Sequence, residues 1–378
     1  MITVLLNKAE FEYDIHSLVK AFYPKEDVYV STKDKEKKEE PVHYHMDVQF
    51  APEEIIFSWK KVEPSEENEN QTGITKRVAV DDTNRKETKN SLKRTLYQLL
   101  SEYTGVELPW GNLTGIRPTK IPMALLEEGK SEEEIARYMK ETYFTSDEKI
   151  KLSIEIAERE LELLHKLDYE EGYSLYIGIP FCPTTCLYCS FTSYSMSAWK
   201  NRMDDYLSAL EKELDYTAVK FAHKKLNSIY IGGGTPTTLN PQQLDRLIRK
   251  IKCSFDLSDL VEFTVEAGRP DSITKEKLMV LRNHDISRIS INPQTMKQET
   301  LDLIGRHHTV QQTIDSFYLA RELGFDNINM DLIVGLPGES LSDVADTMEV
   351  IRKLSPDNLT VHSLAIKRAA RLNIQRER

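Results

Sequence analysis

From residue 173 onward, short apolar segments typical of strands alternate with segments of helical periodicity, and this order constrains the fold more than any other feature. The strand candidates are 173–179, 228–233, 261–267, 287–293, 327–335 and 359–365, and the helical patterns are about 199–221, 242–253, 273–284, 309–323 and 342–354. Such strands run parallel, because a parallel pair needs a crossover connection. Right-handed crossovers then produce a barrel or a doubly wound sheet, and in both architectures ligands bind at the carboxyl ends of the strands.

The residues before this alternation predict a separate α+β domain with connecting helices. The predicted strands are 1–6, 43–50 and 53–62, and the predicted helices are 12–22, 84–104, 121–143 and 146–167. The polar runs 31–40 and 64–73 are predicted loops. We therefore divide the chain into an N-terminal domain at 1–168, a second domain at 169–368 and a basic C-terminal tail at 369–378.

Arg117 and Lys120 stand in a loop punctuated by Gly and Pro, WGNLTGIRPTK at 110–120. Such a loop can bind an anion or dock onto the second domain. An ordered connection between domains is the more common use of a loop of this kind.

The composition limits the classes of protein that this chain can belong to. Its 378 residues suggest two or three domains, and 40% hydrophobic residues suffice for packed cores. Fifty Lys and Arg against 61 Asp and Glu give a net charge of −11, which argues against a general nucleic-acid binder. No apolar run approaches the ~18 residues of a membrane span, and Lys8 and Glu10 interrupt the N-terminal apolar run. We therefore expect a cytoplasmic protein.

Three of the four cysteines, Cys182, Cys186 and Cys189, lie within eight residues just after the first strand of the second domain. This spacing supplies three soft thiolates from one loop, and thiolates bind iron–sulfur clusters and zinc. A structural zinc site normally has a fourth protein ligand, whereas three ligands on a four-iron cluster leave one iron open. A zinc site or three unrelated thiols is the alternative. Cys253 lies in an apolar helical pattern and is predicted to pack in the core.

Glycine and carboxylate residues end the next two predicted strands. The turn IGGGTPT at 231–237 offers backbone groups without side-chain obstruction, although a plain loop has the same composition. In VEFTVEAGRP, the strand period of two places Glu262, Thr264 and Glu266 on one side. A carboxylate at the end of such a strand can bind an ammonium group, or it can simply be solvated.

Charged residues also mark the later strands. Asp331 lies inside an apolar strand, where a charge needs partners. Arg306 can bind a carboxylate bidentately or cap a helix end. The adjacent His307 and His308 are predicted to lie at the surface or in a loop and not to form a metal pair.

The segment YIGIPFCPTTCLYC at 176–189 resembles the cluster loop of radical S-adenosylmethionine (SAM) enzymes. More narrowly, residues 170–368 resemble the oxygen-independent coproporphyrinogen III oxidase (dehydrogenase) family, and the extra N-terminal domain is similar to that of a coproporphyrinogen-dehydrogenase-like branch. The resemblance implies a partial (β/α)6 barrel, a [4Fe–4S] cluster on the three clustered cysteines, and SAM on the open iron. The other residues that match the family's cluster and SAM contacts are Tyr176, Tyr188, Gly233, Gly234, Thr235, Glu266, Gln294, Arg306, Asp331 and Ala365.

The resemblance also implies a function, namely oxidative decarboxylation of coproporphyrinogen III to protoporphyrinogen IX in anaerobic heme biosynthesis. The implied partners are a porphyrinogen or heme ligand and an electron donor protein. One alternative is a heme-chaperone-like paralogue without dehydrogenase activity. Another is a radical SAM enzyme that acts on a different substrate such as RNA.

The sequence departs from the family pattern in three places. Gly178 replaces a histidine that the group links to catalysis, and Phe191 stands where some coproporphyrinogen oxidases have an additional cysteine. Family members usually continue into a C-terminal domain that covers the substrate cleft, whereas this sequence ends at Arg378. We therefore expect a shortened or divergent member.

Overall fold

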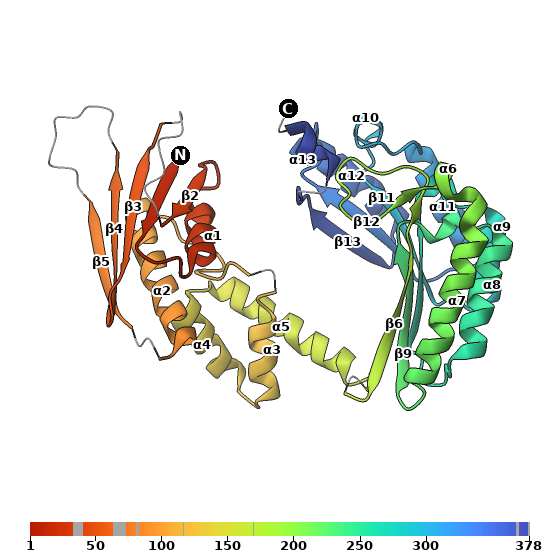
Figure 1. The fold of residues 1–378 in the computed structure, drawn as a ribbon, viewed down its shortest axis with the longest axis horizontal. Coiled ribbons are helices and arrows are strands. Elements are labelled where there is room, and N and C mark those ends of the chain that lie inside the picture. The colour runs from red at the N-terminus through yellow and green to blue at the C-terminus, as the bar shows by residue number, and fades with distance from the viewer. Residues whose placement is uncertain are drawn as a thin grey trace. The chain divides into compact units, whose positions relative to one another are not determined.

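The computed structural model describes residues 1–32, 41–62, 73–80, 83–115, 117–168, 170–367 and 370–376. Its contacts divide the chain into two compact units, Met1–His165 and Lys166–Arg378, whose elements are labelled in Figure 1. Most of the predicted polar loops at 31–40 and 64–73 lies outside the described residues. Among the helices of the described ranges, none is long and apolar enough to cross a membrane.

The first unit is built on a five-stranded sheet with the order β2-β1-β3-β4-β5. Strand β1 (Ile2–Leu6) pairs in parallel with β2 (Val28–Ser31) and β3 (Tyr44–Phe50), and β4 (Glu54–Lys61) and β5 (Ile74–Ala79) continue the sheet antiparallel. Alternate residues of β1, β3 and β4 are buried in one core with residues of α1 (Glu12–Phe22) and α2 (Arg85–Thr104). The α+β prediction is therefore confirmed, with β2 and β5 as additional strands.

Three further helices complete the first unit, and polar caps begin two of them. They are α3 (Lys120–Glu127), α4 (Glu132–Tyr143) and α5 (Asp147–Leu164). Ser131 and Glu134 form a capping box at the start of α4, and the Ser146 side chain accepts the Lys149 N–H at the start of α5. Their apolar faces share a small second core that includes Ile135 and Ile154.

The second unit contains a parallel sheet whose six strands lie in chain order, from β6 at one edge to β13 at the other. The strands are β6 (Gly172–Ile179), β9 (Lys225–Gly233), β10 (Glu262–Gly268), β11 (Arg288–Gln294), β12 (Ile328–Val334) and β13 (Asn358–Ser363). A doubly wound sheet reverses its strand order at a switch point, whereas this order does not reverse. The structure is thus the predicted partial (β/α)6 barrel.

Helices follow the strands in the predicted alternation, and Figure 1 shows α7, α8 and α9 along the outer side of the sheet. The helices of this unit are α6 (Met196–Trp199), α7 (Met203–Lys220), α8 (Pro241–Ser254), α9 (Lys275–Asn283), α10 (Gln298–Leu303), α11 (Val310–Glu322), α12 (Leu341–Leu354) and α13 (Arg371–Arg376). Outward-facing strand residues such as Ile231 and Val265 form the core with these helices. Polar side chains lie on the opposite face of the strands, away from these helices.

The prediction that Cys253 packs in the core is wrong. The buried face of α8 consists of Leu244, Leu247, Ile248 and Ile251, and Cys253 is exposed. Cys253 follows Ile251 by two residues, which is about 200° around an α-helix. The apolar pattern was correct for the helix, but this position belongs to its solvent side.

Candidate functional site

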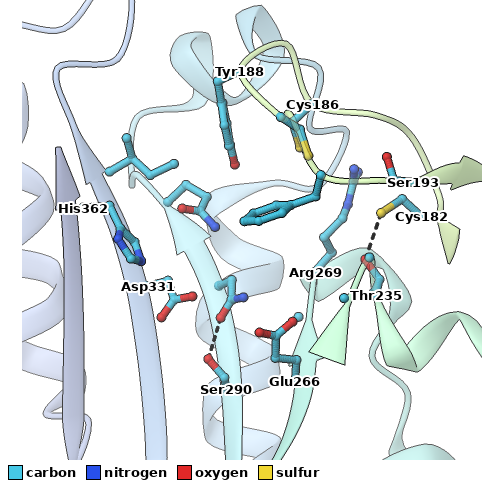
Figure 2. A pocket seen from close by; sticks show the side chains of 18 of the residues that line it. Cys182, Cys186, Tyr188, Ser193, Thr235, Glu266, Arg269, Ser290, Asp331 and His362 are labelled. Carbon is cyan, nitrogen blue, oxygen red and sulfur yellow. Dashed lines mark hydrogen bonds between the residues drawn. The ribbon is translucent and has the colours of Figure 1, made fainter. Parts of the chain in front are cut away.

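A cavity of about 480 Å³ is lined by residues at the carboxyl ends of the parallel strands and by the loop that follows β6. Figure 2 shows the thiols of Cys182 and Cys186 on one side of it and Glu266 and Asp331 on another. The predicted site residues that line the cavity are Cys182, Cys186, Tyr188, Cys189, Gly233, Gly234, Thr235, Glu266, Gln294, Arg306, Asp331 and Ala365. Residues separated by up to 183 positions in the sequence (182 to 365) therefore meet at one edge of the sheet.

Tyr176 is the predicted site residue that the structure does not place on the cavity wall. Its side chain is exposed, and its ring stacks on that of Tyr230, with 5.8 Å between the ring centroids. Tyr230 itself lines the cavity. The contact of Tyr176 with this site is thus indirect in the structure.

The loop at 182–189, which we call the cysteine loop, is held at several points. Cys182 ends β7 (Phe181–Cys182), which pairs with β8 (Tyr194–Ser195). The Leu187 N–H donates to the Ile304 carbonyl over 2.9 Å, and the Leu187 carbonyl accepts the Leu372 N–H over 2.9 Å. Segments that lie far apart in the chain therefore fix the loop, and the predicted basic tail contributes one of them.

Burial makes ionisation of the thiols unfavourable unless a positive partner is present. It raises the pKa of Cys182 and of Cys189. The Thr235 hydroxyl, which donates to the Cys182 sulfur over 3.7 Å, lowers the pKa of Cys182, and so does the charge of Arg269. Arg306 lowers the pKa of Cys189. Both thiols are therefore harder to ionise than a free cysteine, and a cation bound in the loop would stabilise their thiolate forms.

The glycine turn after β9 lies directly against the cysteine loop. Gly233 has φ +107°, a conformation that residues with a side chain rarely adopt. A Cβ on Gly234 would lie 2.7 Å from the Phe181 carbonyl oxygen and 3.0 Å from the Cys182 sulfur. These positions need glycine because the backbone itself forms the cavity wall.

Glu266, two residues before the end of β10, is a partly buried carboxyl with one strong donor. The Tyr230 hydroxyl donates to it over 2.5 Å. Burial raises the pKa of Glu266 to about 7, and Asp331 adds to this effect, while the Tyr230 hydrogen bond opposes it. An ammonium group placed in the cavity would favour the ionised form.

A polar network crosses the inner face of the sheet beside Glu266. The Asn329 side chain donates to Asp331 over 2.7 Å and to the Ser290 hydroxyl over 3.0 Å, and it accepts from the Thr360 hydroxyl over 3.0 Å. Asp331 therefore has the partner that its position in an apolar strand requires. We did not predict Ser290, Asn329 or Thr360 as site residues, although the period of two along each strand places them on the face of Asp331.

Gln294 at the end of β11 and Arg306 after α10 each have a buried polar atom that lacks a hydrogen-bond partner among the described residues. Gln294 has φ +69°, and its Oε1 atom has no hydrogen-bond partner among the residues that the structure describes. Arg306 is buried, and its guanidinium donates to the Asn292 carbonyl instead of capping a helix. Within the same described ranges its Nε atom is also unpartnered. Polar groups of this kind mark a place where a ligand can supply the missing hydrogen bonds.

His308 lies in the loop before α11, which is one of the two predicted settings, but it is fully buried and not at the surface. Both of its ring nitrogens lack hydrogen-bond partners in the described part of the chain. Burial lowers the pKa of His308 to about 4, so the ring is neutral at physiological pH. His307, by contrast, is exposed as predicted.

The comparisons with known proteins agree with this geometry. Residues 176–351 match the Radical SAM superfamily. The oxygen-independent coproporphyrinogen-III oxidase-like protein HemZ of Bacillus subtilis is 45% identical over 291 residues, which are 76% of this chain and 58% of that protein. The heme chaperone HemW of the same organism is 40% identical over 51% of each chain. The oxygen-independent coproporphyrinogen III oxidase of Escherichia coli is 33% identical over 52% of this chain and 42% of its own. The chain thus spans about half the length of the curated relatives that it matches.

Proposed function

Because this chain belongs to the radical SAM superfamily and groups with oxygen-independent coproporphyrinogen III oxidase-like proteins, we propose that it oxidatively decarboxylates coproporphyrinogen III to protoporphyrinogen IX. The observation that carries this proposal is the cavity that joins three thiols of one loop to polar groups on five neighbouring strands, β9 to β13. The 45% identity to the HemZ protein supports the choice of substrate.

Radical SAM proteins use a [4Fe–4S] cluster and SAM, and the residues of the cavity fit both groups. Cys182, Cys186 and Cys189 would hold the cluster. The glycine turn leaves room beside the Cys182 sulfur, where a methyl group on Gly234 would be only 3.0 Å away. When bound, the cluster and SAM together supply a 5′-deoxyadenosyl radical.

The inner wall of the cavity would bind the charged groups of SAM. Glu266 and Asp331 are the carboxylates available for an ammonium group, and the buried Arg306 is available for a carboxylate. The unpartnered atoms of Gln294 and Arg306 fit this arrangement, since a ligand would complete their hydrogen bonding. Exclusion of water by the buried wall protects a radical from side reactions.

In the proposed reaction, the cavity would hold a propionate side chain with its β-carbon accessible to hydrogen-atom removal by the 5′-deoxyadenosyl radical. The Cα–carboxylate bond then breaks, carbon dioxide leaves, a vinyl double bond forms, and one electron passes to a one-electron acceptor. The protein positions the substrate carbon and leaves the difficult chemistry to the cofactor. An electron donor protein, the partner proposed for this chain, would supply the electron that the cluster requires. Four free cysteines, one of them exposed, fit a reducing compartment such as the cytoplasm.

One observation favours heme chaperoning as a second candidate. The chain is 40% identical to a heme chaperone but 33% identical to the E. coli oxidase. Gly178, which stands in place of the family's catalytic histidine, points in the same direction. A Cβ at Gly178 would meet only Tyr176, at an ordinary 3.7 Å, so crowding is not the reason for glycine there.

An anaerobic assay separates the two functions. Reconstituted, reduced protein is incubated with SAM and coproporphyrinogen III, and 5′-deoxyadenosine, carbon dioxide and vinyl products are measured; Cys253→Ala serves as a control that should keep full activity. Formation of vinyl product in step with 5′-deoxyadenosine supports the oxidase. Deoxyadenosine without decarboxylated porphyrinogen refutes it, and stoichiometric heme binding without turnover supports the chaperone. If Gly178→His gains decarboxylation that the natural chain lacks, the glycine explains the loss.

A further inference from the structure

Thr184, between the first two cysteines of the cysteine loop, is bound on two sides by other parts of the barrel. Its hydroxyl donates to the Gly305 carbonyl over 2.9 Å. The Arg269 Nη1 atom donates to the same hydroxyl over 2.7 Å and to the Thr184 carbonyl over 3.1 Å. One guanidinium nitrogen therefore contacts both the backbone and the side chain of the loop that carries the thiols.

Arg269 is itself held rigidly. It follows directly after β10, and its side chain is only 3% exposed. Its Nε and Nη2 atoms donate to the two carboxylate oxygens of Asp271 over 3.0 and 2.8 Å. A bidentate pair of this kind fixes the plane of the guanidinium, which a lysine ammonium cannot reproduce. Asp271 thus aims the remaining nitrogen of Arg269 at Thr184.

The pair also places a buried cation, Arg269, on the loop that carries the thiols, with the Asp271 carboxylate bound to its Nε and Nη2 atoms. Figure 2 shows the Arg269 side chain between the strand ends and the loop that carries Cys182 and Cys186. A cluster bound by thiolates becomes more negative when it is reduced, and nearby charges and hydrogen bonds set its potential. The buried cation of Arg269 therefore favours the reduced state, and the carboxylate of Asp271, which is more exposed, opposes it more weakly.

We propose that Arg269, oriented by Asp271, is a positioning residue that fixes the cysteine loop through Thr184 and raises the reduction potential of the cluster. Arg269 is not among the residues matched to the family's cluster and SAM contacts. The proposal rests on the assignment of Cys182, Cys186 and Cys189 as ligands. Cys182→Ala tests that assignment separately, because full iron and sulfide in this variant would refute the ligands whatever Arg269 does.

The test uses the full chain with three variants, Arg269→Gln, Arg269→Lys and Asp271→Asn. Arg246→Gln is the matched control, since Arg246 binds Glu211 bidentately over 2.7 and 2.7 Å between α7 and α8, on the outer side of the sheet. After anaerobic reconstitution, iron and sulfide are determined. The midpoint potential is then measured by a redox titration followed by electron paramagnetic resonance, without SAM.

The two charge variants should move the potential in opposite directions. Arg269→Gln removes the cation and leaves Asp271, so its potential should fall, whereas Asp271→Asn should raise it. Arg269→Lys should keep a potential near that of the natural protein but bind less iron, because the ammonium cannot contact Asp271 and Thr184 in the same way. Arg246→Gln should change neither quantity.

Shifts of the same sign in both charge variants, or no shift in either, would overturn the electrostatic part of the proposal. If Arg269→Gln and Arg269→Lys both bind as much iron as the natural protein, the claim that Arg269 fixes the cysteine loop is overturned. If Arg269→Gln retains its circular dichroism spectrum but takes up no iron, positioning is supported, and the sign of the shift in Asp271→Asn decides the electrostatic part.

Discussion

Replacing Glu266 by glutamine should remove a pH dependence that this one carboxyl gives to the stability of the cluster-free protein. Burial is the main cause that raises the pKa of Glu266 from 4.5 to about 7. The hydrogen bond from Tyr230 lowers this pKa, and the charge of Asp331 raises it. The folded chain therefore holds a proton at Glu266 between about pH 5 and 7, where the unfolded chain has released it. Glutamine has nearly the same shape and can still accept from Tyr230, but it does not titrate.

The sign and size of the effect follow from this shift. Because the pKa is raised in the folded state, the stabilising contribution is complete below pH 4.5 and is lost as the pH rises through 7. The rise of the pKa from 4.5 to about 7 corresponds to about 3 kcal/mol of unfolding free energy. Most of it, about 2 kcal/mol, is lost between roughly pH 5 and 8. The natural protein should lose this amount relative to Glu266→Gln over that interval.

Pulse proteolysis in urea, with fragments assigned by mass spectrometry to residues 166–378, measures the unfolding free energy of the second unit at each pH. Glu262→Gln, four residues earlier on the same side of β10, is the control and should keep the natural pH dependence because Glu266 is still present. If the natural protein and Glu266→Gln show parallel profiles from pH 5 to 8, the assignment of a raised pKa to Glu266 is refuted.

Cys182→Ala should abolish iron and sulfide uptake. Cys253→Ala changes the exposed side of α8 and should take up both as the natural protein does. Equal uptake in the two variants would show that the ligand assignment is wrong. Gly234→Ala should lower the visible absorbance of the reconstituted cluster, because its methyl group would lie 2.7 Å from the Phe181 carbonyl oxygen, and unchanged absorbance would contradict this reasoning. Asn84→Ala should destabilise the first unit by about 1 kcal/mol, because the Asn84 side chain caps α2. A urea midpoint equal to that of the natural protein would contradict that expectation.

The architecture of the second unit could be predicted because its signals are local and repeated. Each strand is a short apolar run, each helix has its own apolar face, and the alternation alone dictates a parallel sheet. The carboxyl ends of parallel strands meet at one edge, so residues as distant as Cys182 and Ala365 could be expected in one site. In the first unit, β5 was missed because its sequence, ITKRVA, is half polar and none of its residues is fully buried.

The contacts that hold the site could not be predicted in the same way. Arg269 and Thr184 are 85 residues apart, and nothing in either local sequence indicates that a guanidinium reaches a threonine. His308 illustrates the same limit, since a histidine in a polar segment gives no sign that another part of the chain will cover it. Cys253 shows that a periodic pattern establishes a helix more securely than it assigns the positions beside its apolar face.

A sheet whose strands lie in chain order can grow at one edge during synthesis, because each new strand pairs with the one made just before it. The cysteine loop emerges after β6, the first strand, but Leu372, which donates its N–H to Leu187 of that loop, emerges only after β13. The thiols are therefore translated early and enclosed late. At the pace of translation, on the order of ten seconds pass between the emergence of the thiols and that of Leu372.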